Sequence, residues 1–303
     1  MFNEIDKNRF ISTINIEQYP NYYWDNMFEK IAPIEEMYDK DLYNFSKKEI
    51  ISLYKYFDSK SFDYIRVTNF NFIKYAQWAL QETLIVDGQN HFAELTKDEI
   101  LGCINKFGME QSIITREELL ELLNRITSSR DKFGLIATFE GLKGKDFCEI
   151  LEANVADITG NKMKLSTGRI VEVSDNLVLI AGEASKEEKY NSVGGKQYTL
   201  YGEYGQIYKQ LRDNYTNMLE KGKRFQKVVR NVLDFLGVSR YVTLNSIFTS
   251  GLIDCINKFA DQDNTTAEEV LNNERYLEYL KNQYGYNNKI NNKFILKYKD
   301  YLK

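Results

Sequence analysis

The sequence predicts a mainly α-helical chain with a small β-sheet inserted in its second half. Proline is nearly absent, with two residues in 303, and glycine is sparse at 17 residues, which favours helices joined by short loops. Three segments begin with the same helix-starting pattern, and residues 161–180 contain short runs typical of strands. About two domains are expected for a chain of this length.

The three helix starts are FSKKEI from Phe45, LTKDEI from Leu95 and ITREEL from Ile114. Each places Ser or Thr at the N-cap and Glu three residues later, with an apolar residue before the cap and another at the fourth helical position. This combination is a capping box with a hydrophobic staple, which provides partners for backbone N–H groups at the helix start. Each segment therefore predicts the first turn of a helix.

In the first half, helices are expected from about Lys47 to Phe57, from Tyr64 to Gln81, and briefly after Thr96. Residues 1–45 are predicted to be an N-terminal arm with an aromatic cluster, YPNYYWDNMF, that packs onto the core. Residues 46–110 are predicted to form a helical domain, with a boundary near Gly108–Ser112. The stripe expected to face inward on the second helix is Val67, Phe70, Ile73, Ala76 and Leu80.

The second domain, residues 111–303, is predicted to open with two helices, Arg116–Ser128 and Lys132–Phe139. Strands are expected at Met163–Leu165 and Arg169–Val173, separated by a turn at Thr167-Gly168. Further helices are expected at Ile207–Leu211, Phe225–Leu236, Leu244–Asp261 and Ala267–Gln283.

Composition excludes several classes of protein. Hydrophobic residues at 43% and charged residues at 28% are ordinary for a soluble globular chain. No apolar run approaches the roughly 18 residues of a membrane span, and the N-terminus does not resemble a signal peptide. The cysteines, Cys103, Cys148 and Cys255, are odd in number and far apart, which indicates reduced thiols in a cytoplasm. The single histidine, His91, excludes a two-histidine mechanism, so no metal site and no cofactor are expected.

The charge is segregated along the chain, although its net value is only −4. Residues 221–230, KGKRFQKVVR, contain five basic residues and no acid. Residues 289–303 contain five lysines and one acid, whereas residues 261–278 are acidic. Local patches therefore indicate more about a partner than net charge does.

Three longer motifs resemble the tyrosine recombinase (phage integrase) family over about residues 40–285. ITREELLELLNRI, from Ile114, looks like the first helix of that family's catalytic domain. GLKGKDFCEILEANVADI, from Gly141, is similar to its G-L-R-x-x-E-L corner, and VSRYVTLNSIFTSGLI, from Val238, is similar to its V-T-x-H-x-L-R-H segment. The resemblance implies a helical, SAM-like core-binding domain followed by a catalytic-type domain.

The family's chemistry implies a tyrosine nucleophile, two arginines that clamp a DNA phosphate, a lysine on a β-hairpin and two His or Trp residues. This sequence departs from that set. Lys143 stands at the first arginine (or Asp146, if Glu149 sets the register), Asn245 at the first histidine and Phe248 at the second arginine. Thr249 replaces the following histidine. Late tyrosines that fall near the nucleophile's place are Tyr276, Tyr279, Tyr284 and Tyr286. The sequence therefore predicts a chain that does not cut DNA.

Two stretches, FEKIAPIEEMYDKDLYNFSKKEI from Phe28 and EGLKGKDFCEI from Glu140, resemble the MrpR (YopR) family of master repressors of SPbeta-type phages. That resemblance implies non-catalytic, sequence-specific binding to repeated operator sites on double-stranded DNA, repressing lytic genes in lysogeny. The location implied is the nucleoid in the bacterial cytoplasm. A regulatory antagonist protein is a conceivable second partner, although nothing in the sequence encodes one, and the oligomeric state stays open.

If DNA binds between the two domains, each domain should contribute cations that contact it, because phosphate contacts provide most of the affinity. In the first domain, the expected DNA-facing residues are Lys47, Lys48, Arg66 and Lys74. In the second, they are Lys143, Lys145, Lys162, Lys164, Arg169, Lys221, Lys223, Arg224, Lys227, Arg230, Arg240 and Asn245. Two alternatives stay open: a protein-interaction module that no longer binds DNA, and an active recombinase that uses Lys143 and a late tyrosine.

Overall fold

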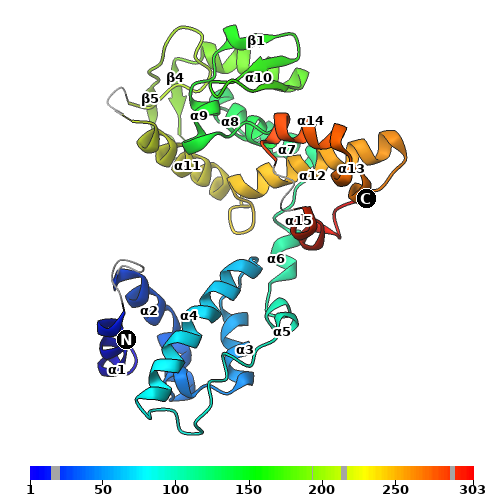
Figure 1. The fold of residues 1–303 in the computed structure, drawn as a ribbon. Coiled ribbons are helices and arrows are strands. Elements are labelled where there is room, and N and C mark those ends of the chain that lie inside the picture. Colours follow the sequence, from blue (N-terminus) through cyan, green and yellow to red (C-terminus); the bar gives the residue numbers. More distant parts are fainter. Residues whose placement is uncertain (15–20, 193, 213–216, 287–290) are drawn as a thin grey trace. The chain divides into compact units, whose positions relative to one another are not determined.

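The structure is a computed structural model that describes residues 1–14, 21–192, 194–212, 217–286 and 291–303. These residues form two compact units, Met1–Met109 and Glu110–Lys303. Both units are mainly helical, and the small sheets lie in the second (Figure 1). The predicted fold class is confirmed. Among the described helices, none is both long and apolar enough to cross a bilayer.

The first unit contains α1 (Glu4–Thr13), α2 (Asn21–Tyr38), η1 (Leu42–Asn44), α3 (Lys47–Tyr56), α4 (Phe62–Gln81), α5 (Lys97–Leu101) and α6 (Lys106–Glu110). Its core is aromatic, with Trp24, Phe28, Tyr54 and Tyr75 almost fully buried. The segment expected to be an arm, residues 1–45, thus contributes α1, α2 and η1 to the same core as α3 and α4.

The predicted helix starts are confirmed. Capping boxes at Ser46, Thr96 and Thr115 open α3, α5 and α7 (Arg116–Asn124), and in each the Glu three residues on accepts from the N-cap backbone N–H. At Thr115 this bond measures 2.7 Å. Local sequence alone determines these starts, because cap and partner lie within one turn.

The predicted inward stripe of α4 is wrong at two positions. Val67 and Phe70 are 44% and 54% exposed, and the buried face combines apolar side chains such as Phe72 and Tyr75 with polar ones. Asn69 is buried because its amide accepts a hydrogen bond from the Tyr54 hydroxyl at 2.7 Å and donates to the Phe92 carbonyl at 3.2 Å. Asn71 likewise donates to the Tyr23 hydroxyl. The buried polar side chains of α4 are thus satisfied by partners that lie far away in the sequence.

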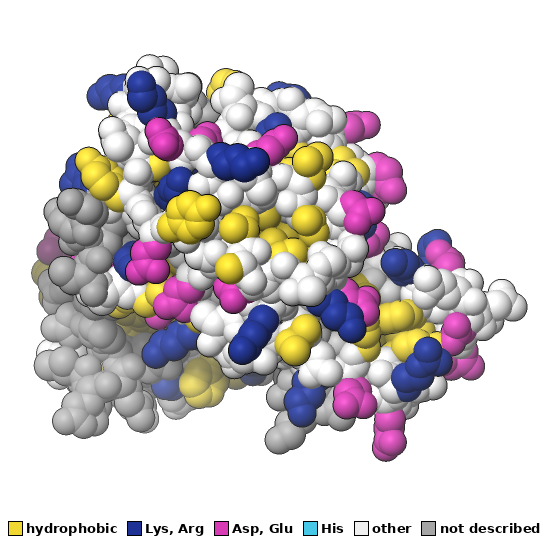
Figure 2. All heavy atoms as spheres, turned by 90° about the horizontal axis from the view of Figure 1, so that it is seen from above, with side chains coloured by type: hydrophobic (Ala, Val, Ile, Leu, Met, Phe, Trp, Pro, Cys, Tyr) yellow, Lys and Arg dark blue, Asp and Glu magenta, His cyan; other side chains and the backbone are white. Residues whose placement is uncertain are grey.

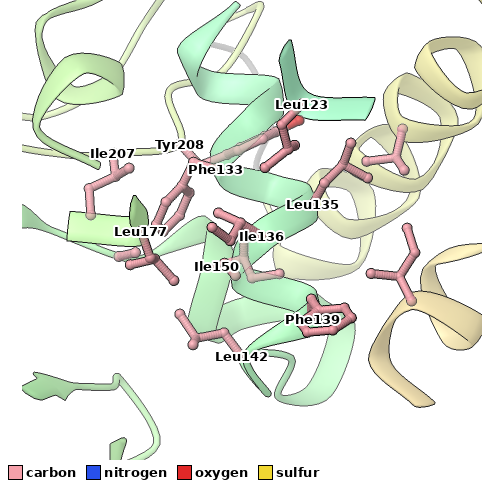
Figure 3. Packing of buried hydrophobic residues seen from close by; sticks show 14 of the residues in the cluster. Leu123, Phe133, Leu135, Ile136, Phe139, Leu142, Ile150, Leu177, Ile207 and Tyr208 are labelled. Atoms are coloured by element: carbon pink, nitrogen blue, oxygen red, sulfur yellow. The ribbon is translucent and has the colours of Figure 1, made fainter. Parts of the chain in front are cut away.

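The second unit is built around α8 (Ser129–Phe139), whose Phe133, Ile136 and Phe139 lie in the centre of the core (Figure 3). Short elements follow: η2 (Lys145–Phe147), α9 (Cys148–Leu151), η3 (Val155–Asp157), β1 (Ile158–Thr159), β2 (Lys162–Lys164), β3 (Ile170–Glu172), α10 (Asp175–Lys186), β4 (Lys189–Asn191) and β5 (Gln197–Thr199). The helices α11 (Met218–Phe235), α12 (Leu244–Asp263), α13 (Ala267–Asn272), α14 (Glu274–Tyr284) and α15 (Asn291–Tyr298) complete the unit.

The first sheet is antiparallel in the order β1-β2-β3, and Met163 pairs with Val171 on its buried face. The hairpin between β2 and β3 agrees with the predicted strands and with the predicted turn, where Gly168 has a φ of +87°. A second, two-stranded sheet pairs β4 with β5. Helices α10, α11 and α12 each pack against α8.

Two other expectations differ from the structure, and some helices were not predicted. One of these is α10, residues 175–186, which begins where the Ser174 hydroxyl accepts from the Leu177 N–H. Residues 207–211 do not form the expected helix; Ile207 donates its N–H to the Ala153 carbonyl at 2.9 Å, and Gln210 forms an isolated antiparallel bridge with Tyr201. The helix expected at 267–283 is two helices, since Asn273 has extended backbone angles and its side chain caps α14. Helix α15 is a further element that the sequence did not predict.

Candidate nucleic-acid interface

The segment from Gly141 to Leu151, here called the corner, joins α8 to α9 through tight turns. Gly141 has a φ of +96°, and a Cβ there would lie 2.3 Å from the Gln283 carbonyl oxygen. The backbone N–H of Lys143 donates to a carboxylate oxygen of Glu149 at 2.8 Å. Only glycine fits at position 141, where the chain turns sharply. The hydrogen bond to Glu149 then holds the turned segment in place.

Arg169, on the hairpin side of the corner, forms a two-pronged ion pair with Glu149. Its Nε and Nη2 lie 2.9 and 2.5 Å from the two carboxylate oxygens, and it also donates to the Gly141 and Asn282 carbonyls. Burial alone would raise the pKa of Glu149, but hydrogen bonds from Arg169, Thr167 and the Lys143 backbone outweigh it and lower that pKa. Arg169, expected to face DNA, thus has its guanidinium directed into the corner in this structure.

Three residues that the motif alignment puts at catalytic positions of the integrase family come together at the corner. The Lys143 ammonium donates to the Asn245 Oδ1 at 3.0 Å and lies 5.0 Å from the centre of the Phe248 ring. Burial lowers the pKa of Lys143. Asn245 and Phe248 lie on the first turns of α12, which Thr243 caps. The structure thus assembles, from residues 102 positions apart, the site that the motifs indicated; we call it the Lys143 cluster.

The Lys143 cluster offers little to a phosphate in a transition state. The phenyl ring of Phe248 has no hydrogen-bond donor, and Lys143 is a single point charge where a bidentate guanidinium is required. The hydroxyl of Thr249 donates to the Asn245 carbonyl at 2.9 Å, within its own helix. Asp146, the alternative at the first arginine, is a carboxylate and would repel phosphate.

Of the four late tyrosines, three are buried and Tyr279 is half-buried. Tyr284 is buried, and its hydroxyl donates to the Gly251 carbonyl at 2.8 Å. Tyr279 donates to the Glu172 carboxylate at 3.1 Å. Burial raises the pKa of Tyr279 and of Tyr284, and it raises the pKa of Tyr286 to about 12. The side chain of Tyr276 is 6% exposed. A raised pKa opposes the phenolate that would attack phosphorus.

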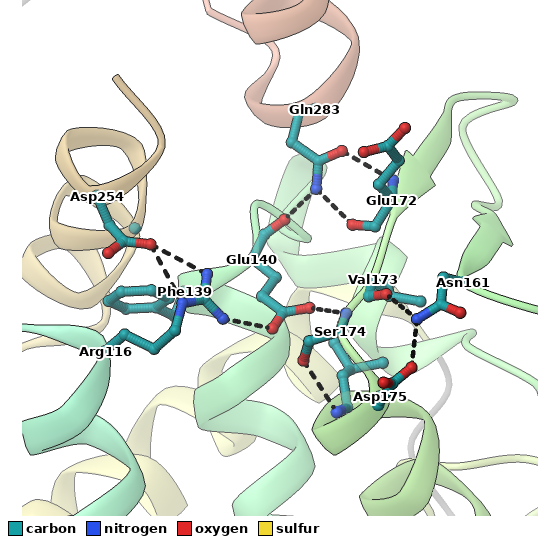
Figure 4. A network of polar contacts seen from close by, with 12 residues as sticks. Arg116, Phe139, Glu140, Asn161, Glu172, Val173, Ser174, Asp175, Asp254 and Gln283 are labelled. Carbon is teal, nitrogen blue, oxygen red and sulfur yellow. Dashed lines mark hydrogen bonds and ion pairs between the residues drawn. The ribbon is translucent and has the colours of Figure 1, made fainter. Parts of the chain in front are cut away.

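A polar network beneath the corner joins five elements (Figure 4). Arg116 of α7 pairs with Glu140 and with Asp254 of α12, both at 3.1 Å. The Gln283 amide donates to the Glu140 and Glu172 carbonyls at 2.7 and 2.8 Å, and accepts from the Glu172 N–H. The network fixes α14 against β3 and α8. Sequence analysis missed it, because its members lie up to 143 residues apart.

The densest predicted basic patch lies on α11. Lys223, Lys227 and Arg230 are exposed, and their i, i+4, i+7 spacing places them on one side of the helix, here called the α11 face. Lys221 and Arg224 are half-buried, and the Arg224 Nε has no hydrogen-bond partner among the described residues.

The α11 face begins directly beside the corner. A Cβ at Gly222 would lie 2.5 Å from the Asp146 carbonyl oxygen, so the first turns of α11 touch η2, which carries the exposed Lys145. Ion pairs in the described part of this unit involve Arg116, Arg130, Arg169 and Lys303, and no cation of α11. The start of α11 thus lies against the segment that carries Lys145.

The other predicted cations of the second unit are on β2 and near the start of α12. Lys162 and Lys164 are exposed on β2, on the side opposite the buried Met163. The Arg240 guanidinium lies 5.2 Å from the Tyr241 ring centre. On the face drawn in Figure 2, basic and acidic side chains are interspersed around hydrophobic patches, so that face carries no continuous basic stripe.

In the first unit the four predicted cations are also exposed or half-buried. Lys47 pairs with Glu99 at 2.9 Å, and Arg66 pairs with Asp63 at 3.3 Å. Lys48 is exposed. The Lys74 ammonium lies 4.7 Å from the Phe70 ring centre. In the described chain, no group of three or more His, Cys, Asp or Glu side chains is arranged to hold a metal ion.

The chain matches the family descriptions "MrpR, N-terminal core-binding domain" over residues 1–81 and "MrpR, C-terminal catalytic domain" over residues 113–303. It belongs to the MrpR family. The "SPbeta prophage-derived uncharacterized protein YopR" of Bacillus subtilis (strain 168) is 27% identical to this chain over 209 residues. That match covers 65% of this chain and 62% of the relative's length, which is less than two thirds.

The match to the MrpR family confirms the family resemblance predicted from the corner and from the segment at residues 28–50, and with it the integrase-like fold of core-binding and catalytic-type domains. Among solved structures, the crystal structure of XerA recombinase aligns with 96% of this chain and 92% of its own, at 11% identity and a TM-score of 0.39. That likeness is too distant to inform the site.

Proposed function

We propose that this chain is a non-catalytic, sequence-specific DNA-binding protein that represses phage lytic genes and so maintains lysogeny. The Lys143 cluster carries the proposal. The corner keeps its shape through Gly141 and Glu149, yet the side chains at the catalytic positions are an amine, an amide and a phenyl ring. A corner of this shape without the donors that phosphate cleavage needs supports binding without strand cleavage.

Retained binding is supported by the cations around the corner. Lys223, Lys227 and Arg230 are exposed on one side of α11 and pair with no acid among the described residues. Each cation that contacts a phosphate releases condensed counterions, so such a patch gives salt-sensitive affinity even though the chain's net charge is −4. The α11 face therefore supplies affinity that the net charge does not suggest.

Loss of cleavage is supported by the groups at the corner. Removing a single donor to a developing oxyanion costs about 10²–10³ in rate. Here Phe248 replaces one guanidinium and Lys143 the other, while the Tyr284 and Tyr279 hydroxyls bond within the protein. The combined losses leave no means of activating a tyrosine toward phosphorus.

The expected partner is double-stranded DNA with repeated operator sites, met on the nucleoid in the bacterial cytoplasm. The proposal is tested by mobility shift with the purified chain, using fragments that tile the DNA of the prophage and its flanks at 50 mM salt. A shift restricted to fragments that share a repeated sequence is the expected result. The absence of any shift would contradict the proposal and favour a protein-interaction module.

A further inference from the structure

One lysine and two carboxylates are buried together in the first unit. The side chains of Lys7 on α1 and Glu35 on α2 have no exposed surface, and that of Asp41, between α2 and η1, is 4% exposed. The Lys7 ammonium lies 2.5 Å from Glu35 and 3.7 Å from Asp41. Among the described residues, no other cation pairs with either carboxylate. This group, here called the α1 cluster, therefore contains two acids and one base.

Neutral groups complete the hydrogen bonding of the two carboxylates. Glu35 accepts from the Leu42 N–H at 2.8 Å. Asp41 accepts from the Tyr75 hydroxyl of α4 and from the Asn3 amide, both at 3.0 Å. These bonds stabilise a carboxylate, but they supply no positive charge, so they do not balance a second buried anion.

The cations next to the α1 cluster along the chain pair with other acids. Arg9 pairs with Asp6 at 3.1 Å, and Lys40 pairs with Glu49 at 2.8 Å. Asp6 also accepts a hydrogen bond from the Tyr43 hydroxyl at 3.1 Å, so it adds a further acid on α1 rather than a balancing charge. The excess negative charge of the α1 cluster is therefore relieved by binding a proton.

Buried carboxylates that compete for one cation retain a proton to higher pH than exposed ones do. Burial raises the pKa of Glu35 from 4.5 to about 7, and it also raises the pKa of Asp41; in both, the charge of Lys7 opposes the rise without cancelling it. Burial raises the pKa of Tyr43 and of Tyr75 as well, so these phenols stay protonated near neutral pH. The proton that the cluster releases near neutral pH is thus a carboxyl proton.

We propose that the α1 cluster is a proton-controlled latch, which keeps α1 docked while one carboxyl proton is bound and releases α1 when that proton leaves. Helix α1 lies beside α2 (Figure 1), and Lys7 is the fully buried charge that it contributes. The ring centre of Phe10, also on α1, lies 4.9 Å from that of Trp24 and 5.6 Å from that of Trp78. Release of α1 therefore exposes an aromatic surface on the first unit. This inference does not depend on DNA binding.

The direction of the pH effect follows from the pKa of Glu35 in the two states. In the docked state this pKa is about 7, and in a released, hydrated state it returns to 4.5. The contribution to docking is therefore fully present below pH 4.5 and is lost as pH rises through 7, because the docked state binds the proton more tightly. Between pH 5.5 and 7.5, the equilibrium constant for release of α1 should rise about 20-fold.

The experiment is hydrogen–deuterium exchange of the full-length chain at pH 5.5 and 7.5, with each rate divided by the intrinsic exchange rate at that pH. Peptides that cover Glu4–Thr13 report on α1. Peptides from α3 report on unfolding of the first unit as a whole, because α3 contributes to the same core. Lower protection in α1 than in α3 identifies opening of α1 alone.

The test variants are Glu35→Gln and, separately, Asp41→Asn. Each leaves one carboxylate beside Lys7, so the buried charge is balanced without a proton. The control, Glu36→Gln, removes an acid from an exposed position on the same helix. Circular dichroism checks the fold of each variant, and the pH response of the wild type decides the question if a variant does not fold.

In the wild type and the control, protection of α1 should fall about 20-fold from pH 5.5 to 7.5, and in each test variant the change should be below about threefold. Protection of α1 that does not change with pH in the wild type would overturn the inference, as would an equal fall in the test variants. Equal protection of α1 and α3 would also overturn it, because the first unit would then open as a whole. The proposed function stands or fails independently, by the mobility shift.

Discussion

Replacing Lys223 and Lys227 by glutamine should change how DNA affinity depends on salt. Each phosphate contact contributes about 0.9 to the slope of log affinity against log salt concentration, so losing two should reduce the slope by about 1.8. Between 50 and 200 mM salt, a fourfold change, this corresponds to about 12-fold. The ratio of wild-type affinity to variant affinity should therefore be about 12-fold smaller at 200 mM salt than at 50 mM salt.

The assay is fluorescence anisotropy with a labelled duplex at several salt concentrations between these limits. The matched control is Lys258→Gln with Lys281→Gln, which removes the same charge from exposed positions on α12 and α14. The control should keep the wild-type slope, because those lysines lie outside the α11 face. This comparison separates local phosphate contacts from the effect of net charge.

Equal slopes for wild type and the α11 variant would refute the reasoning that this face contacts phosphates. A reduced slope in both the variant and the control would also refute it, because the effect would then follow net charge rather than position.

Three further predictions concern the scaffold. Gly251→Ala should destabilise the second unit by about 3 kcal/mol, because its Cβ would lie 1.7 Å from the Phe139 carbonyl oxygen; urea unfolding measures it, and an unchanged midpoint would contradict the packing. Gly182→Ala, mid-helix in α10 with nothing within 4 Å, should instead be neutral or gain about 0.5–1 kcal/mol. Glu149→Gln should cost about 2–3 kcal/mol at pH 7, since Arg169 loses its buried partner. The pKa of Glu149 is held below its usual 4.5, so its stabilisation is present above that pH and is lost as pH falls through the lowered value. The difference in unfolding free energy between wild type and variant should therefore narrow as pH falls below 4.5, and a difference that does not narrow in acid would argue against this ion pair.

Features encoded within one turn of the chain could be predicted from the sequence. The capping boxes at Ser46, Thr96 and Thr115 each join two residues three positions apart, and all three form. The corner was also recognisable, because its glycines and Glu149 form a contiguous motif. Lys143 and Asn245 were placed by motif alignment, and the structure brings them within 3.0 Å.

Features set by distant partners could not be predicted. Asn69 is buried because Tyr54 and the Phe92 carbonyl provide its hydrogen bonds, whereas the apolar Phe70 beside it is exposed. Arg169 was predicted to face DNA because it is a cation on the hairpin. In the structure, however, Glu149, 20 residues earlier, holds its guanidinium in the corner. In both cases burial follows hydrogen-bond partners that no periodicity reveals.

The central claim is that the corner holds DNA without cutting it. The most direct measurement incubates the purified chain with a nicked suicide duplex bearing a sequence that it shifts, then resolves the products on a denaturing gel beside an active recombinase on its own site. The account predicts a strong mobility shift under native conditions and no covalent protein–DNA adduct. An adduct that Tyr279→Phe or Tyr284→Phe abolishes would contradict it.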